Sequence, residues 1–142
     1  MKIMGLDFGS KRIGVAMSDE LFLIAHAFDF IQRRDIKRDL EVIRGLVAEH
    51  SISEIVVGLP LNMDGSYGAK SKEVIEFMDN LSKVVSVPVK TWDERLTSVQ
   101  AERVLIEADM SRAKRRFLSD KVAAQIILQG YLDARKRGQD NA

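Results

Sequence analysis

The chain has 142 residues, a formal net charge of +1 and no cysteine. The length predicts one domain over residues 1–142, and the balanced charge gives no global basic field for nucleic acid. The absence of cysteine excludes disulfides, thiolate catalysis and Cys-type zinc sites. No apolar run approaches about 18 residues, so we expect a cytoplasmic protein that does not bind a membrane.

The first predicted element is an apolar strand that contains a carboxylate. Over residues 1–8, strand alternation places Ile3, Gly5 and Asp7 on one face and larger apolar side chains on the other. Both faces are predicted to be buried, so Asp7 is expected to be an inward carboxylate. An ionised carboxylate in such a place needs a cation, a metal or several hydrogen-bond donors, which makes Asp7 a candidate functional residue.

Two short strands, over residues 13–18 and 23–31, are predicted next. Their short connections predict an antiparallel meander with the first strand. From Asp35 the apolar period becomes helical, with one stripe running over residues 36–47. This helix is the expected crossover.

A central parallel strand is predicted over residues 55–58, where apolar side chains occupy both faces. Turn residues follow it, and a second helix then carries an apolar stripe over residues 74–81. Residues 87–92 are expected to form the last strand, near an edge of the sheet because Pro88 cannot donate to a ladder.

The C-terminal part is predicted to be two helices separated by a basic link. A capping-box pattern at residues 97–100 begins the first helix. The link spans residues 112–117, and Ser119 is expected to cap the last helix. From about residue 135 the chain is a polar tail that is expected to fray. The predicted order is βββαβαβαα, an α/β fold.

Three acidic positions are candidates for one shared site. Ligands gather outside the carboxyl ends of parallel strands, where Asp7 ends the first strand and Asp93 and Glu94 follow the last one. Asp120 opens the last helix on its inward stripe. Converging carboxylates are most easily reconciled by a divalent cation, and oxygen-only ligands suit Mg²⁺ or Mn²⁺. This site would support metal-dependent hydrolysis of a phosphodiester.

Each of these candidates also has a structural interpretation. Asp120 could only complement a helix dipole. Adjacent residues at a strand end point in opposite directions, so at most one of Asp93 and Glu94 is expected to be a ligand. The basic link of residues 112–117 could be a solvated connection or a phosphate contact.

Four ordered motifs resemble the YqgF (RuvX) family of ribonuclease H-like proteins, described as Holliday-junction resolvase-like and as pre-16S ribosomal RNA nucleases. The likeness runs from Met4 to about Leu132. The motifs occupy residues 5–16, 57–66, 93–98 and 120–128.

The resemblance implies a ribonuclease H-like fold with a mixed five-stranded sheet, in the order 3-2-1-4-5, flanked by helices. It also implies a nuclease site in which Asp7, Glu94 and Asp120 are catalytic and hold Mg²⁺ or Mn²⁺, with Asp93 as the alternative to Glu94. Backbone phosphates would be met by a set of basic residues. This set is Lys11, Arg12, Arg95, Arg112, Lys114, Arg115 and Arg116.

Our leading hypothesis is a divalent-metal-dependent endonuclease that acts on structured nucleic acid, as a monomer or a homodimer. The family description favours processing of the precursor 16S ribosomal RNA 5′ end in ribosome biogenesis over resolution of a Holliday junction in branched DNA.

Two other functions stay open. Many ribonuclease H-like nucleases place an acid at the end of the fourth strand, where this chain has residues 58–60 and no acid. This departure motivates a non-catalytic nucleic-acid-binding assembly factor. Nucleotide hydrolysis is a third possibility, because residues 7–11 resemble the first phosphate loop of actin-like kinases.

Overall fold

The computed structural model describes residues 1–93 and 112–140, with side chains of the second range described for residues 122–138. The predicted helix that begins at residues 97–100 lies outside the described residues. The described elements are β1 (Lys2–Phe8), β2 (Arg12–Ser18), β3 (Ala25–Gln32), α1 (Ile36–Glu49), β4 (Ile52–Leu59), α2 (Ala69–Val84), β5 (Val89–Asp93) and α4 (Arg112–Asp140).

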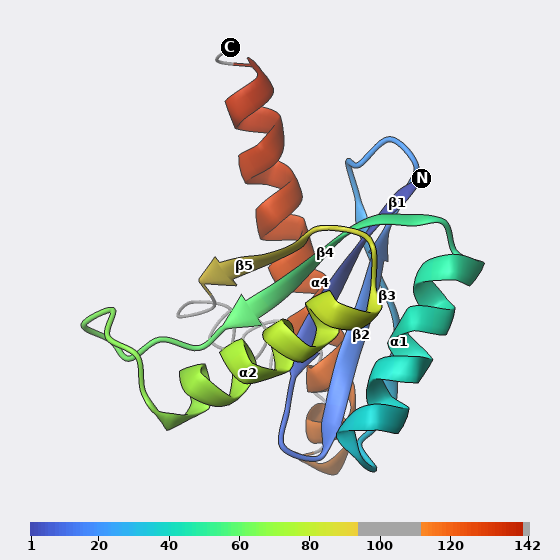
Figure 1. Cartoon of the computed structure of the whole chain (residues 1–142). Helices are drawn as coiled ribbons and strands as arrows, with labels where there is room; N and C mark the ends of the chain where they lie inside the picture. Colours follow the sequence, from blue (N-terminus) through green and yellow to red (C-terminus); the bar gives the residue numbers. More distant parts are fainter. Residues whose placement is uncertain (94–111, 141–142) are drawn as a thin grey trace.

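The five strands form one mixed sheet in the order β3-β2-β1-β4-β5, which confirms the predicted topology (Figure 1). β1 pairs antiparallel with β2 and parallel with β4, and β4 pairs parallel with β5. β3 is also antiparallel to β2, so it runs in the same direction as β1. The carboxyl ends of β1, β3, β4 and β5 therefore lie at one end of the sheet, which we call the carboxyl edge.

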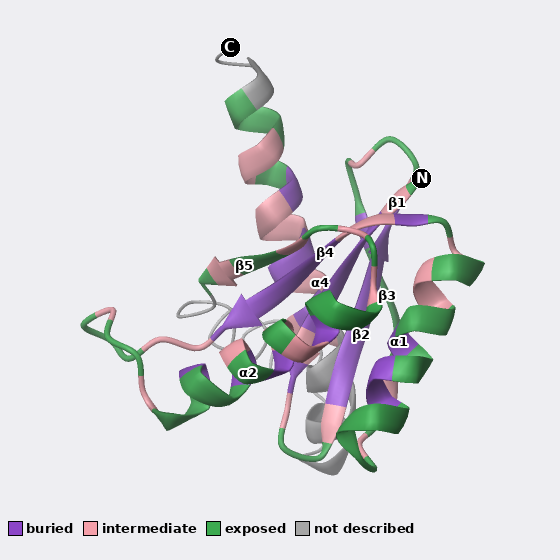
Figure 2. Cartoon of the chain, in the orientation of Figure 1, coloured by how far each residue is buried: buried purple, intermediate pink, exposed green. Residues whose placement is uncertain are grey.

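The two faces of the sheet carry separate cores, as the alternation in β1 predicted. Met4 and Leu6 point into a cluster with α1 and α2, whereas Ile3 belongs to a cluster with Ile127 and Leu128 of α4. Figure 2 shows that β1, β2 and β4 are mostly buried between these helices. Because both faces of β1 are covered, the first strand is the centre of the fold.

Helix α1 begins where the sequence predicted. The Asp35 side chain accepts a hydrogen bond from the backbone N–H of Arg38, which satisfies one of the unpaired donors of the first turn. Leu40 and Ile43 are buried on the stripe that faces the sheet. The cap and the apolar period therefore agree, and the helix starts at the next residue, Ile36.

Helix α4 corrects the predicted link and cap. Residues 112–117 and Ser119 lie inside one continuous helix that runs from Arg112 to Asp140. Arg, Lys, Ala and Leu dominate this segment, and all of them favour the helix, so a single serine does not interrupt it. The residues from 135, expected to form a fraying tail, also continue the helix.

No helix in the part of the chain that the structure describes has the length and apolar character needed to cross a membrane.

A polar cluster attaches α4 to β4 and to the edge strand β5. The Tyr131 hydroxyl donates a hydrogen bond to Glu54 of β4, and the Lys90 ammonium of β5 lies 3.2 Å from the same carboxylate. Burial raises the pKa of Tyr131 above its usual value of 10.0, and the hydrogen bond to Glu54 raises it further. The neutral hydroxyl is therefore the form that the folded protein prefers.

Tyr131→Phe is expected to lower the free energy of unfolding by about 1 kcal/mol at pH 8, because Glu54 loses a donor. A raised folded-state pKa stabilises the protein below pH 10 and stops doing so as the pH rises through that pKa. The stability of Tyr131→Phe should therefore fall less than that of the wild type between pH 9 and pH 11 in urea unfolding experiments. Tyr67→Phe, at an exposed position, is the control and should follow the wild type. Equal pH dependence in all three proteins would contradict the prediction.

Candidate functional site

Asp7 lies at the carboxyl edge, one residue before the end of β1 and opposite Gly14 of β2. By alternation it shares the sheet face of Ile3, which α4 covers. The sequence predicted an inward, buried carboxylate, but Asp7 is only partly buried. The physical reason is its place near the end of the strand, because the chain that follows reaches the surface. Gly9 is partly buried and Ser10 is exposed.

The turn after Asp7 is tight and carries two basic residues. The Gly9 N–H donates to the Arg12 carbonyl at 2.9 Å, and a Cβ on Gly9 would lie 2.6 Å from that oxygen. Only glycine fits this close backbone approach. Lys11 is exposed and Arg12 is partly buried with its guanidinium 5.4 Å from the centre of the Phe30 ring. Both predicted phosphate contacts thus lie within a few residues of Asp7.

Asp93 faces the opposite side of the sheet from Asp7. It is the last residue of β5, is exposed, and pairs with Leu59, whose side chain belongs to the cluster beneath α1 and α2. The preceding Trp92 packs instead with the cluster on the α4 side. The structure therefore does not bring Asp93 together with Asp7. Glu94 lies outside the described residues.

Asp120 lies within α4, and its side chain is outside the described ones. The helix runs antiparallel to β1, because Gln129 contacts the start of β3, far from the carboxyl edge. A Cβ on Gly5 would lie 2.8 Å from the Leu128 Cβ and 3.1 Å from the Ala124 carbonyl oxygen, so this part of α4 packs on the middle of β1. The backbone of Asp120, one turn before Ala124, therefore lies toward the carboxyl edge, where Asp7 is.

The remaining predicted phosphate contacts are located by backbone alone. Arg112, Lys114, Arg115 and Arg116 occupy the first turns of α4, so they lie on a helix and not on the predicted link. Arg95 is outside the described residues. Among the side chains that are described, no three His, Cys, Asp or Glu residues are grouped to hold a metal ion.

Arg33 was not predicted as a site residue, yet it holds the turn next to Asp7. Its guanidinium Nη1 donates to the Gly9 carbonyl at 3.0 Å and to the Ser10 carbonyl at 3.2 Å. A signal for it exists in the sequence, because the Arg33-Arg34 pair follows a strand that the predicted meander makes parallel to β1. Because this pair is at the same sheet edge as the candidate carboxylate Asp7, Arg33 and Arg34 could have been predicted as phosphate contacts.

Comparison with known proteins identifies relatives over almost the whole chain. A family model described as RuvX: Holliday junction resolvase matches residues 1–134. A protein of Halothermothrix orenii is 56% identical over 133 residues, which cover 94% of this chain and 95% of the relative. One of Syntrophomonas wolfei is 49% identical over 140 residues, 99% of each chain. Both carry the name "Putative pre-16S rRNA nuclease".

Solved structures share the fold at low sequence identity. RuvC of T. thermophilus, in complex with a Holliday junction substrate, gives a TM-score of 0.60 at 16% identity and covers 96% of both chains. The Fowlpox virus resolvase, solved with Holliday junction DNA, gives a TM-score of 0.59 at 14% identity and covers 95% of this chain and 99% of its own. These likenesses confirm the ribonuclease H-like fold.

Proposed function

The chain belongs to the RuvX family, and from this premise we propose that it is a nuclease, a hydrolase that cleaves phosphodiester bonds in structured nucleic acid. The observation that carries the proposal is the position of Asp7, a partly buried carboxylate at the carboxyl end of the central strand. A second acid, Asp120, lies on the helix that covers the same sheet face, in the part of that helix that extends toward the carboxyl edge. Open α/β sheets bind ligands at this edge.

The substrate that we favour is precursor 16S ribosomal RNA. The relatives that share 49–56% of their residues with this chain carry the name of a nuclease for that RNA. The proteins solved with Holliday junction DNA share only 14–16%. Close sequence relatives are the better guide to a substrate, because one fold serves many functions. The four-way junction is the alternative substrate, supported by the family description.

A divalent metal ion fits the chemistry of the candidate residues. Asp7, Glu94 and Asp120 would offer carboxylate oxygens only, the donors that Mg²⁺ and Mn²⁺ prefer. We favour Glu94 over Asp93 because strand alternation after Trp92 turns Asp93 away from Asp7. A divalent ion bound there would activate a water molecule and stabilise the leaving oxygen of the phosphodiester.

The basic residues around this edge would position the nucleic acid. Lys11 and Arg12 follow Asp7 on the tight turn, so they can contact phosphates next to the cleaved bond. Arg112, Lys114, Arg115 and Arg116 lie at the beginning of α4, before Asp120. Phosphate contacts of this kind fix the register of the substrate and carry no sequence information.

The direct test is cleavage by the purified chain. We expect nicking of a precursor 16S ribosomal RNA fragment with its 5′ extension in Mn²⁺, and none in EDTA. Cleavage rates of a four-way DNA junction and of a linear DNA duplex of the same length, compared with that of the RNA, give the substrate preference. If the chain cuts neither the RNA nor the junction, in Mn²⁺ or in Mg²⁺, the proposed nuclease is refuted.

A non-catalytic assembly factor is the second candidate function. It is favoured by the end of β4, where Gly58, Leu59 and Pro60 provide no acid. If this function is correct, the chain should bind the RNA without metal, Asp7→Asn should bind equally well, and neither protein should cut.

A further inference from the structure

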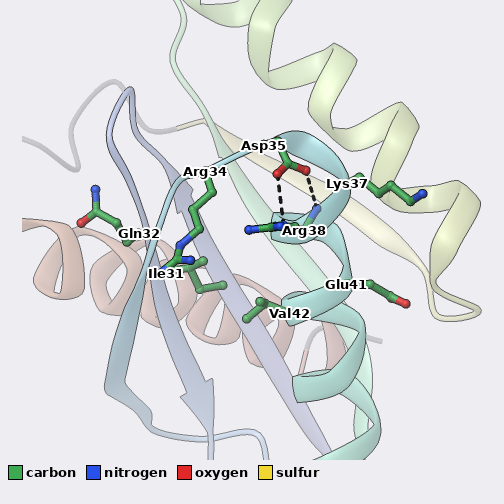
Figure 3. A pocket seen from close by; sticks show the side chains of 8 residues that line it. All are labelled: Ile31, Gln32, Arg34, Asp35, Lys37, Arg38, Glu41 and Val42. Carbon is green, nitrogen blue, oxygen red and sulfur yellow. Dashed lines mark hydrogen bonds and ion pairs between the residues drawn. The ribbon is translucent and has the colours of Figure 1, made fainter.

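An open groove lies where β3 leads into α1, in a segment of residues 31–42 that we call the β3–α1 corner. Its volume is about 740 Å³, and Ile31 and Val42 give it an apolar floor (Figure 3). The lining residues are Ile31, Gln32, Arg34, Asp35, Lys37, Arg38, Glu41 and Val42. Three of these eight side chains are cationic, and Arg33, directly before them, adds a fourth cation beside the groove.

The corner lies at the same end of the sheet as Asp7. β3 runs parallel to β1, so its carboxyl end and the start of α1 reach the carboxyl edge. Figure 1 shows the β1–β2 turn and the beginning of α1 at the same lower end of the molecule. Asp7 is on the α4 side of the sheet and Ile31 is on the α1 side, so nucleic acid bound at Asp7 would pass around the β1–β2 turn to reach the corner.

Two cations of the corner are available to a ligand. Asp35 lies 3.5 Å from the Arg38 guanidinium, and Glu41 forms a 2.6 Å ion pair with Arg44, so both acids already have cationic partners. Among the described residues, no acid forms an ion pair with the exposed side chains of Arg34 and Lys37. Figure 3 shows Arg34 beside Ile31 in the groove, while Lys37 extends outward from the first turn of α1.

The corner is tied to the turn that follows Asp7. The Arg33 N–H donates to the Lys11 carbonyl at 2.9 Å, in addition to the guanidinium hydrogen bonds to the turn. The same guanidinium lies 4.3 Å from the centre of the Phe8 ring. On the other side, the buried Asp39 carboxylate accepts the Arg34 N–H at 3.1 Å. A phosphate held at the corner would therefore sit at a fixed distance from Asp7.

We propose that the β3–α1 corner is a second contact surface for the nucleic-acid backbone, on one side of the bond that is cut. Arg34 and Lys37 take phosphates, and the apolar floor lies against the sugars. The proposal rests on the nuclease function proposed above, since it extends the path of the same substrate. The lining residues carry three positive and two negative charges, and Arg33 joins the corner to the turn beside Asp7, so we take the substrate of the candidate site as the occupant.

The experiment measures binding separately from cutting. Full-length Asp7→Asn protein is used throughout so that the nucleic acid stays intact. The affinity of this protein for a linear DNA duplex is measured by fluorescence anisotropy from 50 to 300 mM salt. Adding Arg34→Gln and Lys37→Gln should reduce the slope of log affinity against log salt by about 1.8, because each phosphate contact contributes about 0.9. Affinity at 50 mM salt should fall at least about tenfold.

The matched control removes the same charge at the opposite end of the molecule. Lys136→Gln with Arg137→Gln changes two exposed cations of the last turns of α4 and should leave the slope unchanged. Exchanging the cations in Arg34→Lys with Lys37→Arg should also keep most of the affinity. Circular dichroism and thermal melting of each variant show that it is folded.

An equal loss of slope in the control pair would overturn the proposal, because binding would then follow total charge. An unchanged slope in Arg34→Gln with Lys37→Gln would overturn it too, and would favour an acidic protein partner. Nicking by the wild-type protein is scored in parallel. Absence of nicking with the expected change in slope refutes only the nuclease, and nicking without that change refutes only the corner.

Discussion

Asp7→Asn is expected to lower the rate of Mn²⁺-dependent nicking by at least about 10³-fold. The substitution keeps the size of the side chain and removes its charge, so the central strand can no longer hold a cation at the carboxyl edge. A bound metal contributes several kcal/mol of charge stabilisation, and each 1.36 kcal/mol is about a tenfold change in rate. Initial rates with precursor 16S ribosomal RNA measure the effect.

Asp79→Asn is the matched control for charge. This aspartate is exposed on α2, on the other face of the sheet, and its substitution should leave the rate within about twofold of wild type. Wild-type rates in Asp7→Asn, with normal rates in the control, would show that Asp7 does not take part in the reaction.

A second pair of variants decides between the adjacent acids. Glu94→Gln should behave like Asp7→Asn, and Asp93→Asn should lose less than about tenfold, because Asp93 faces away from Asp7. The reverse order of rates would make Asp93 the ligand and would mean that the register of β5 changes when substrate binds.

Gly5→Ala is expected to destabilise the fold by about 2–3 kcal/mol, the upper end of the cost of overpacking a core. A Cβ at this position would lie 2.8 Å from the Leu128 Cβ and 3.1 Å from the Ala124 carbonyl oxygen. Neither atom is the end of a flexible side chain, so the helix itself has to move. For a chain of this size, thermal melting should show a loss of about 5–10 °C.

Gly45→Ala is the control for adding a methyl group. Gly45 is exposed in the middle of α1, and its Cβ would meet nothing within 4 Å, so alanine should stabilise the helix by about 0.5–1 kcal/mol. If Gly5→Ala melted no lower than the wild type, the close packing of α4 against β1 would be wrong. Because α4 also carries Asp120, we expect Gly5→Ala to nick more slowly at temperatures where it is folded.

The sequence alone predicted most of the architecture, for reasons that are local. Alternation in β1 indicated two buried faces, and Asp35 with the apolar period after it predicted where α1 begins. The link at residues 112–117 was wrong because Ser119 has the same local signal as a cap or as an interior residue of a helix. Propensity over the whole segment decides between the two.

The candidate site was predicted in part. Asp7 was identified from its chemistry in an apolar strand, but its partial exposure depends on how far the helices cover the sheet. Arg33 is far from Gly9 in the sequence, and its hydrogen bonds to the turn exist only after β3 folds beside β2. The side chains of Asp120 and Glu94 lie outside the described ones, so their roles stay predictions.

The sequence by itself determined the kind and order of the elements, the family and the carboxylate at the end of β1, because these follow from periodicity, residue chemistry and ordered motifs. Only the tertiary structure decided that Asp93 faces away from Asp7 and that Arg33 joins the β3–α1 corner to the turn beside Asp7. The reason is physical: the pairing register and the contacts between distant segments depend on how the strands pack together, and a local pattern does not contain that information.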